Sequence, residues 1–176
     1  MKNILIVVDM QNDFIDAALG TAEAVSIVDN VRNKILSFDG EVIFTRDTHH
    51  QDYMQTREGK FLPVPHCIQG TAGWQICEKL APHTANAKIF DKPTFGSVEL
   101  MEYVVAQNEK EPIGSVMLVG LCTDICVISN AMLIKAALPE TDVKVDASCC
   151  AGVTPQSHAN ALGAMEMCQI IIENKA

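Results

Sequence analysis

The chain has 176 residues, of which 48% are hydrophobic, and it carries a formal net charge of −9 at pH 7. These values favour one folded domain over residues 1–176, and the negative charge argues against nucleic acid or an anionic membrane as a partner. No apolar run is long enough for a membrane span or a signal peptide, so we expect a cytoplasmic protein. The seven cysteines are an odd number and form no CxxC pair, so we expect reduced thiols.

The first part of the chain alternates apolar strands with a helix. A strand is predicted over Asn3–Val8, and the turn that follows, starting at Asp9, is acidic and lacks glycine, which argues against a dinucleotide-binding fold. Apolar residues at helical spacing predict a helix from about Ala22 to Phe38, and a second strand follows over Glu41–Thr45. A polar loop then runs to about Gly73, and a loop of this length in a compact domain is usually functional.

The second part of the chain continues this alternation. Its predicted elements are a short helix Trp74–Leu80, a strand Ala87–Phe90, a helix capped by Ser97, a strand starting at Val116, a helix ending near Leu138, a strand Asp142–Val145, a loop Cys149–Pro155, a helix Gln156–Cys168 and a last strand Gln169–Ile172. Strands that alternate with helices predict a three-layer, doubly wound α/β fold with a mostly parallel six-stranded sheet and helices on both faces.

Reactive side chains follow four of the predicted strands. Asp9, Asp47, Lys92 and Cys126 come after the first, second, third and fourth strands in chain order. In open parallel sheets the ligand binds beyond the carboxyl ends of the strands. We therefore expect these four side chains to converge on one crevice.

Cys126 lies in the first helical turn after the fourth strand. Thr123 and Asp124 are suitable N-caps for that helix, and its N-terminus would favour a thiolate and attract an oxyanion. A buried structural thiol is the competing interpretation, and Cys122 lies in the turn itself, where its N–H is more useful than its sulfur. Asp9 suits a base or an ion-pair partner of Lys92, which in turn suits charge stabilisation or an ordinary solvated surface position.

A second group of side chains suits a metal ion. Asp47 and His49 lie two residues apart on an extended segment, and His66 comes from the long loop. Two imidazoles and a carboxylate would suit zinc, iron or manganese with positions left for water or substrate, while the competing interpretation is a polar surface loop. Phe14 is the better candidate for a pocket wall, whereas packing is the expected role of Trp74 and Phe95.

Five motifs in this order resemble the isochorismatase-like cysteine hydrolase superfamily, and within it the nicotinamidase/pyrazinamidase group. They are Val8–Phe14 (VDMQNDF), Thr45–His49 (TRDTH), Pro65–Gly73 (PHCIQGTAG), Asp91–Ser97 (DKPTFGS) and Gly120–Val127 (GLCTDICV), and together with the elements between them they extend the resemblance over nearly the whole chain.

The resemblance implies roles for particular residues. It implies a catalytic triad of Asp9, Lys92 and Cys126, and a metal site of Asp47, His49 and His66. It also implies a cis peptide bond before Cys122 and an oxyanion hole made by the backbone N–H groups of Cys122 and Cys126. The implied substrate pocket includes Phe14 and Leu121. Many members have an aromatic residue at the position of Thr48 and an alanine at that of Cys122, so the pocket of this chain is expected to differ.

The resulting prediction is an amide hydrolase that converts nicotinamide to nicotinate and ammonia through a thioester on Cys126. One divalent metal ion, with zinc favoured over iron or manganese, would position the substrate, although metal-bound water is a competing nucleophile. The alternatives are another hydrolase of the superfamily, acting on a ureido compound, a different small amide or an isochorismate-like vinyl ether, and a non-catalytic zinc-binding or thiol redox module. We expect a small-molecule carboxamide as the substrate and a homo-oligomeric assembly.

Overall fold

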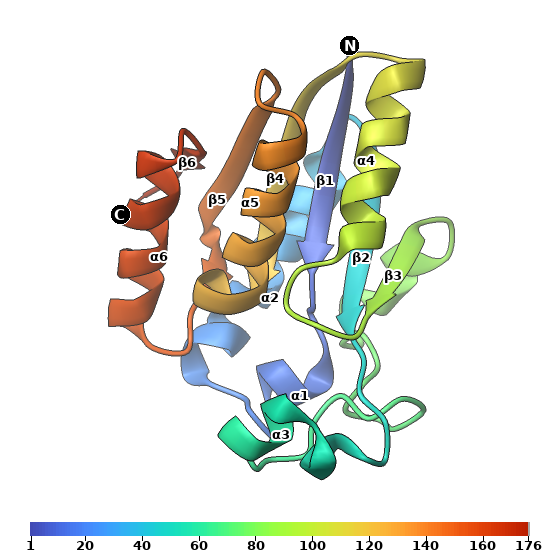
Figure 1. Ribbon diagram of the computed structural model, residues 1–176, viewed down its shortest axis with the longest axis vertical. Coiled ribbons are helices and arrows are strands. Elements are labelled where there is room, and N and C mark those ends of the chain that lie inside the picture. The colour runs from blue at the N-terminus through green and yellow to red at the C-terminus, as the bar shows by residue number, and fades with distance from the viewer. Residues whose placement is uncertain (176) are drawn as a thin grey trace.

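A six-stranded parallel sheet forms the centre of the protein in the computed structural model, which describes residues 1–175 (Figure 1). The strand order is β3-β2-β1-β4-β5-β6, and every neighbouring pair is parallel. The strands are β1 (Lys2–Val8), β2 (Glu41–Asp47), β3 (Lys88–Lys92), β4 (Ile113–Leu121), β5 (Asp142–Ala151) and β6 (Ile171–Glu173). This architecture confirms the predicted α/β fold.

Helices cover both faces of the sheet because the central strands are apolar on both sides. Residues 4, 6 and 8 of β1 pack in one core cluster and residues 5 and 7 in the other, as the alternation of side chains along a strand requires. The first cluster is closed by α4, α5 and α6, which lie in front of the sheet in Figure 1, and the second by α2 behind it. The helices are α1 (Asn12–Ile15), α2 (Ala22–Ser37), α3 (Arg57–Phe61), α4 (Val98–Lys110), α5 (Ile128–Ala137) and α6 (Pro155–Met167).

The chain adds β2 and β3 on one side of β1 and then crosses to place β4 on the other side. This reversal creates a crevice beyond the carboxyl ends of β1 and β4, the place where open α/β sheets bind ligands. The short helices α1 and α3 lie beyond this edge of the sheet, below the arrowheads in Figure 1. The fold therefore brings the carboxyl ends of four strands and two covering segments to one site.

Several predicted boundaries are wrong for local reasons. Residues 74–80 are turns rather than a helix, because Ile76 pairs with Gln11 in an antiparallel bridge and Cys77 N donates to Met10 O. The helical turn in this region is a 3-10 turn that comes later, at Ala81–Thr84. β5 continues past its predicted end at Val145 and into the predicted loop as far as Ala151, which pairs with the end of β4.

The start of the helix after β4 also differs from the prediction. Residues 123–127 form a π-helical turn with Cys122 at its N-cap position, and α5 begins only at Ile128. The side chains expected to cap a helix are used elsewhere, since Thr123 Oγ1 lies 2.7 Å from His158 Nδ1 and the Asp124 carboxylate accepts the N–H of Val153. Turns of this π type occur frequently at functional sites.

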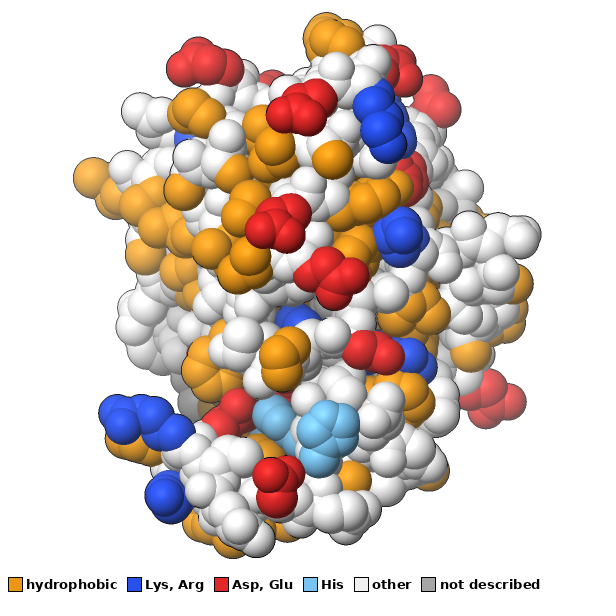
Figure 2. Space-filling view, turned by 45° about the vertical axis from the view of Figure 1, so that its right-hand side comes forward, with side chains coloured by type: hydrophobic (Ala, Val, Ile, Leu, Met, Phe, Trp, Pro, Cys, Tyr) orange, Lys and Arg blue, Asp and Glu red, His pale blue; other side chains and the backbone are white. Residues whose placement is uncertain are grey.

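Hydrophobic side chains remain visible on the outer surface of α4 and α5, interspersed with acidic ones (Figure 2). Val98 is more than half exposed there, and Met101 and Met132 are partly exposed. The homo-oligomer suggested by the sequence stays a prediction. Within residues 1–175, no helix combines the length and the apolar character that a membrane crossing requires.

Candidate active site

Lys92 connects the two other members of the predicted triad. Its Nζ lies 2.6 Å from Asp9 Oδ2 and donates to Cys126 Sγ at 3.4 Å. The same ammonium reaches Asp47 Oδ1 at 3.3 Å and the carbonyl oxygen of Thr94 at 3.2 Å. Lys92 and Asp9 are completely buried, and Cys126 is 5% exposed. The structure thus brings together the side chains that the sequence places on three separate strand ends.

Strand register explains how a lysine comes to lie beside a carboxylate. β2 and β3 run two residues further than predicted, and Asp47 and Lys92, their last residues, are direct register partners. Adjacent parallel strands bring such partners about 4.8 Å apart across the sheet. The sheet therefore places the Lys92 side chain beside Asp47, at the carboxyl ends of β2 and β3.

Asp9 is held in an unusual backbone conformation. Its φ angle is +47°, a region that residues other than glycine rarely adopt. Thr45 stabilises it from β2, because its hydroxyl accepts the N–H of Asp9 and donates to Asp9 Oδ1 at 2.6 Å. Such strain persists where surrounding contacts determine the conformation, and it clusters at functional sites.

Burial dominates the electrostatics of this group. It raises the pKa of Cys126 well above its usual value, and the charge of Asp9 raises it further, although Lys92 lowers it. Burial likewise raises the pKa of Asp9 against the lowering effect of Lys92. For Lys92, burial alone would lower the pKa, but the negative charges around it raise the pKa well above its usual value. The sulfur at rest is therefore a thiol beside a charged lysine, and not the thiolate that the helix N-terminus predicted.

The turn that carries Cys126 is fixed from both sides. The peptide bond between Leu121 and Cys122 is cis, as the resemblance implied. The buried amide of Asn130 donates to the carbonyl oxygens of Cys126 and Phe95 and accepts the N–H of Ser97. One side chain thus ties the turn of the predicted nucleophile to the loop that follows Lys92.

The three predicted metal ligands also come together, and a fourth residue joins them. Donor atoms of Asp47, His49, Glu58 and His66 all lie within 4.8 Å of one another. His49 Nε2 is 2.9 Å from Asp47 Oδ2 and 3.5 Å from Glu58 Oε1, and His66 Nε2 is 3.6 Å and 3.7 Å from the same two oxygens. The sequence analysis missed Glu58, which α3 brings over the site and which no local motif marks.

The donor set suits a divalent cation. His66 Nδ1 lies 2.8 Å from the carbonyl oxygen of Val64, a partner that leaves Nε2 facing the other donors. Burial alone would lower the pKa of His49, but the carboxylates of Asp47 and Glu58 outweigh this effect and raise it to about 9. The cluster therefore favours positive charge, and two imidazoles with two carboxylates match the ligands of zinc.

Residues behind the cluster position it. Gln11 is buried, and its amide accepts the N–H of Asp47 at 2.7 Å and donates to the carbonyl oxygens of Asp47 and Trp74 at 2.9 Å. The carboxylate of Asp13 accepts the N–H of Cys67 at 2.7 Å, next to His66. Hydrogen bonds of this kind orient ligands and tune the affinity of a metal site.

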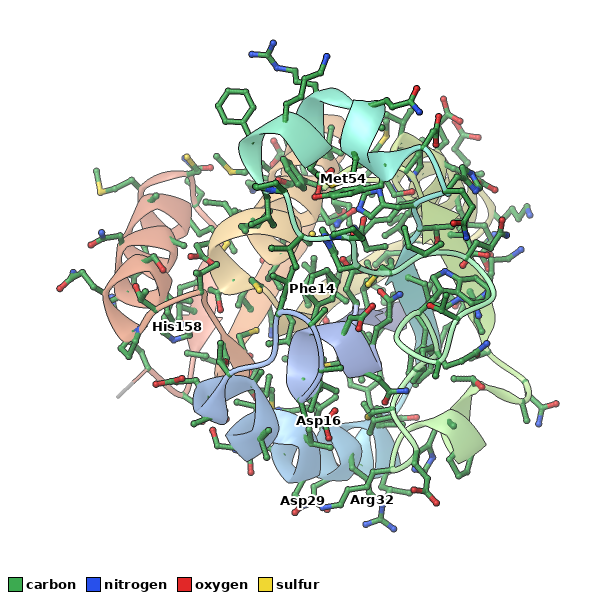
Figure 3. All side chains as sticks on the ribbon, turned by 90° about the horizontal axis from the view of Figure 1, so that it is seen from below. Phe14, Asp16, Asp29, Arg32, Met54 and His158 are labelled. Carbon is green, nitrogen blue, oxygen red and sulfur yellow. The ribbon has the colours of Figure 1, made fainter. Side chains whose placement is uncertain are left out.

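Both groups of side chains open into one cavity of about 660 Å³. Its lining includes Cys126, Asp47 and His66, together with the predicted pocket residues Phe14 and Leu121. Phe14 lies near the middle of the view in Figure 3, between α1 and α3, and its ring meets that of His66 edge to face at 5.5 Å. Phe95 also lines the cavity and is 42% exposed, so the prediction that it serves in packing is wrong.

Trp74 does not belong to this lining and packs as expected. Its indole N–H donates to Thr48 Oγ1 at 2.9 Å, and the guanidinium of Arg46 lies 3.7 Å from the centre of its ring. Thr48, the residue at which this chain departs from many members of the resembled group, is therefore the hydrogen-bond partner of Trp74.

Comparisons with known proteins agree with this fold. The isochorismatase domain model matches residues 3–176. An uncharacterized isochorismatase family protein, PncA of Bacillus subtilis (strain 168), is 28% identical over 144 residues, which cover 75% of this chain and 78% of the relative. The crystal structure of nicotinamidase/pyrazinamidase PncA from Bacillus subtilis has a TM-score of 0.84 and 26% identity, and the match covers 99% of this chain and 100% of that chain. The pyrazinamidase of Pyrococcus horikoshii in complex with zinc has a TM-score of 0.78 and 26% identity over 98% of each chain.

Proposed function

Because the chain belongs to the isochorismatase family of hydrolases, we propose that it hydrolyses a small planar carboxamide, with nicotinamide as the substrate and nicotinate and ammonia as the products. The similar solved structures named for nicotinamidase and pyrazinamidase support this substrate. We also propose that residues 1–176 act as one domain, since both helix layers pack on the same sheet.

One observation carries the proposal. A buried ammonium, that of Lys92, lies within 2.6 Å of a carboxylate and 3.4 Å of a thiol, beside the cavity that also contains the metal donors. A carboxylate can remove the proton of a thiol and return it to a leaving group, and a fixed cation stabilises the charge that develops between these events. A role in packing alone would not explain a buried ion pair with a thiol beside a cavity.

The first half of the reaction follows from this arrangement. As the substrate carbonyl approaches, Asp9 takes the proton of Cys126, and the sulfur attacks the carbonyl carbon while Lys92 offsets the added negative charge. Backbone N–H groups of Cys122 and Cys126 bind the tetrahedral oxyanion, a type of contact whose removal typically raises a barrier by about 3–4 kcal/mol. Asp9 then protonates the departing nitrogen, the C–N bond breaks, and a thioester remains on Cys126.

The second half uses the same groups. A water molecule enters the position that ammonia leaves, and Asp9 takes its proton as the oxygen attacks the thioester. The Cys126 sulfur departs and recovers the proton, which regenerates the resting thiol. Phe14 and Leu121 contribute to the walls that hold the aromatic ring during both steps.

Asp47, His49, Glu58 and His66 would hold the metal ion, because their donor atoms converge and their types match those that zinc prefers. When bound, the ion would supply a Lewis-acid contact for the ring nitrogen, which places the carbonyl against the sulfur. The residues behind the cluster, Gln11 above all, keep Asp47 oriented for that purpose.

Ammonia release from a panel of nicotinamide, pyrazinamide and a ureido compound tests the substrate. We expect ammonia release from nicotinamide and pyrazinamide, loss of activity after treatment with a chelator, and recovery of activity with zinc. Elemental analysis of the purified protein identifies the metal that it contains. Release from the ureido compound alone would contradict the proposed substrate.

Intact mass spectrometry tests the covalent step. We expect the mass of an acyl adduct in rapidly quenched wild-type enzyme and neither adduct nor activity in Cys126→Ala. Cys168→Ala, which changes an exposed cysteine away from the cavity, is the matched control and should retain both. An active Cys126→Ala enzyme would instead favour metal-bound water as the nucleophile.

A further inference from the structure

The cavity extends past Cys126 on the side away from the metal donors. Its lining includes Asp47, which ends β2, and also Gly152 and Val153, which follow β5. Since β1 and β4 lie between β2 and β5, these two ends are three strand spacings, or about 14 Å, apart. This length is more than a six-membered ring with one carboxamide fills, and the volume of about 660 Å³ lies in the range of sites for larger ligands.

We call the far end of the cavity the β5 compartment and define it by the lining residues Leu19, Thr21, Ala24, Gly152 and Val153. None of these residues is charged, whereas the charged residues of the lining belong to β2 and α3 at the metal end. A compartment with this lining suits an uncharged, mainly apolar group.

Hydrogen bonds hold the walls of the β5 compartment in place. Val153 donates its N–H to both carboxylate oxygens of Asp124, at 3.1 and 3.2 Å, so this wall is attached to the turn that carries Cys126. The opposite wall includes the start of α2, a helix that is bonded to β5 through Asn30 Nδ2 and the carbonyl oxygen of Ser148. The compartment is therefore built from fixed elements on both sides.

The order of groups along the cavity indicates which part of a substrate would reach this compartment. In the proposed function, on which this step rests, the ring lies at the metal donors, the carbonyl carbon at Cys126 and the carbonyl oxygen at the backbone of the same turn. The remaining substituent of the carbonyl carbon is the amide nitrogen, and it points onward to the β5 compartment. We propose that the enzyme also hydrolyses N-substituted carboxamides, whose apolar nitrogen substituent binds in the β5 compartment and leaves as a primary amine.

The chemistry of this second activity balances without a further reactant. The Cys126 sulfur forms a bond to the carbonyl carbon, the bond from that carbon to the substituted nitrogen breaks, and Asp9 transfers the thiol proton to the nitrogen, which departs as RNH₂. The thioester is the same one that the primary amide forms, so water releases the same acid. Only the leaving group, and the compartment that receives it, differs between the two substrates.

Parallel assays of nicotinamide and N-benzylnicotinamide with the zinc-loaded enzyme test the inference, with nicotinate, ammonia and benzylamine measured separately. We expect kcat/KM for the benzyl amide to be at least one tenth of that for nicotinamide. Val153→Phe should lower the ratio of kcat/KM for N-benzylnicotinamide to kcat/KM for nicotinamide by at least about tenfold, because the larger side chain fills the space that the benzyl group would occupy. Val25→Phe is the matched control, because Val25 and Val153 are both 51% exposed and only Val153 lines the cavity; it should leave both rates unchanged.

The outcomes separate this inference from the proposed function. Ammonia without benzylamine overturns the β5 compartment and leaves the proposed function intact, whereas benzylamine without ammonia supports the compartment and overturns nicotinamide as the substrate. Release of neither product overturns both. An unchanged ratio in Val153→Phe overturns the placement of the substituent, and Leu19→Phe, at another residue of the β5 compartment, gives the same test if Val153→Phe fails to fold.

Discussion

Replacement of Gln11 by methionine tests how the metal site is held. The Gln11 side chain is fully buried and makes three hydrogen bonds to main-chain atoms, two to Asp47 and one to Trp74. Methionine has a similar size but leaves all three backbone groups without this partner. A buried backbone group that loses its partner costs about 1–3 kcal/mol, so with three such groups we expect the free energy of unfolding to fall by at least about 3 kcal/mol. For a domain of this length, that loss corresponds to a decrease in Tm of about 6–12 °C.

The same replacement should weaken metal binding, because Gln11 holds the peptide groups on both sides of Asp47. Loss of a partner behind a metal ligand typically lowers metal affinity about 10- to 100-fold. Each factor of ten removes about 1.4 kcal/mol of the stabilisation that a bound ion gives to the folded state. The effect of Gln11→Met on unfolding should therefore be larger with zinc than with a chelator.

Urea unfolding in zinc and in chelator, together with zinc competition against a chromophoric chelator, measures both effects. Asn12→Leu is the control, because the side chain of the neighbouring Asn12 makes a single, exposed hydrogen bond, to the carbonyl oxygen of Ala72. This variant should lose less than about 1 kcal/mol of stability without a change in zinc affinity. If Gln11→Met unfolds like the wild type in chelator, the hydrogen-bond reasoning is refuted. A zinc affinity within twofold of the wild type would refute the connection to Asp47.

Three further changes test other parts of the structure. Lys92→Met leaves two buried carboxylates without their cation and should lower the free energy of unfolding by about 3–5 kcal/mol, measured in urea, besides abolishing ammonia release. Burial alone would raise the pKa of Asp146, but the groups that bond to its carboxylate outweigh burial and lower the pKa. The wild type should therefore be more stable than Asp146→Asn at pH 7, and this difference should shrink below about pH 4. Urea unfolding at several pH values measures the difference. A Cβ at Gly73 would lie 2.1 Å from the carboxylate of Asp13, which accepts the N–H of Cys67 next to His66. Gly73→Ala should therefore weaken zinc binding in the competition assay. Gly163→Ala, which has open space around it, should not.

The convergence of the triad could be predicted from the sequence because it depends on topology. Alternating strands and helices determine a parallel sheet, and a parallel sheet brings Asp9, Lys92 and Cys126 to one edge whatever the details of packing. Glu58 could not be predicted in this way. It lies on α3, a short helix within the predicted loop, and its position depends on how that helix lies over the finished site.

Two errors show where local patterns mislead. The apolar residues Ile76, Cys77 and Leu80 are spaced as in a helix, but they reach the core from turns because Gln11 and its neighbour Met10 provide backbone partners for this segment. The expected capping by Thr123 also failed, since its hydroxyl is paired with His158. Both outcomes depend on residues far away in the sequence, which a window of a few turns does not contain.

The protonation state of the Cys126 sulfur differs from the sequence-based prediction for a more general reason. The position of Cys126 at a helix start predicted a stabilised thiolate, but the fold also buries it, and desolvation of a charge in the interior outweighs the field of one helical turn and one lysine. Because the pKa of Asp9 is raised by the same burial, the carboxylate is a stronger base than a free aspartate. In the proposed function, reactivity therefore comes from moving a proton between these two buried groups when a substrate is present.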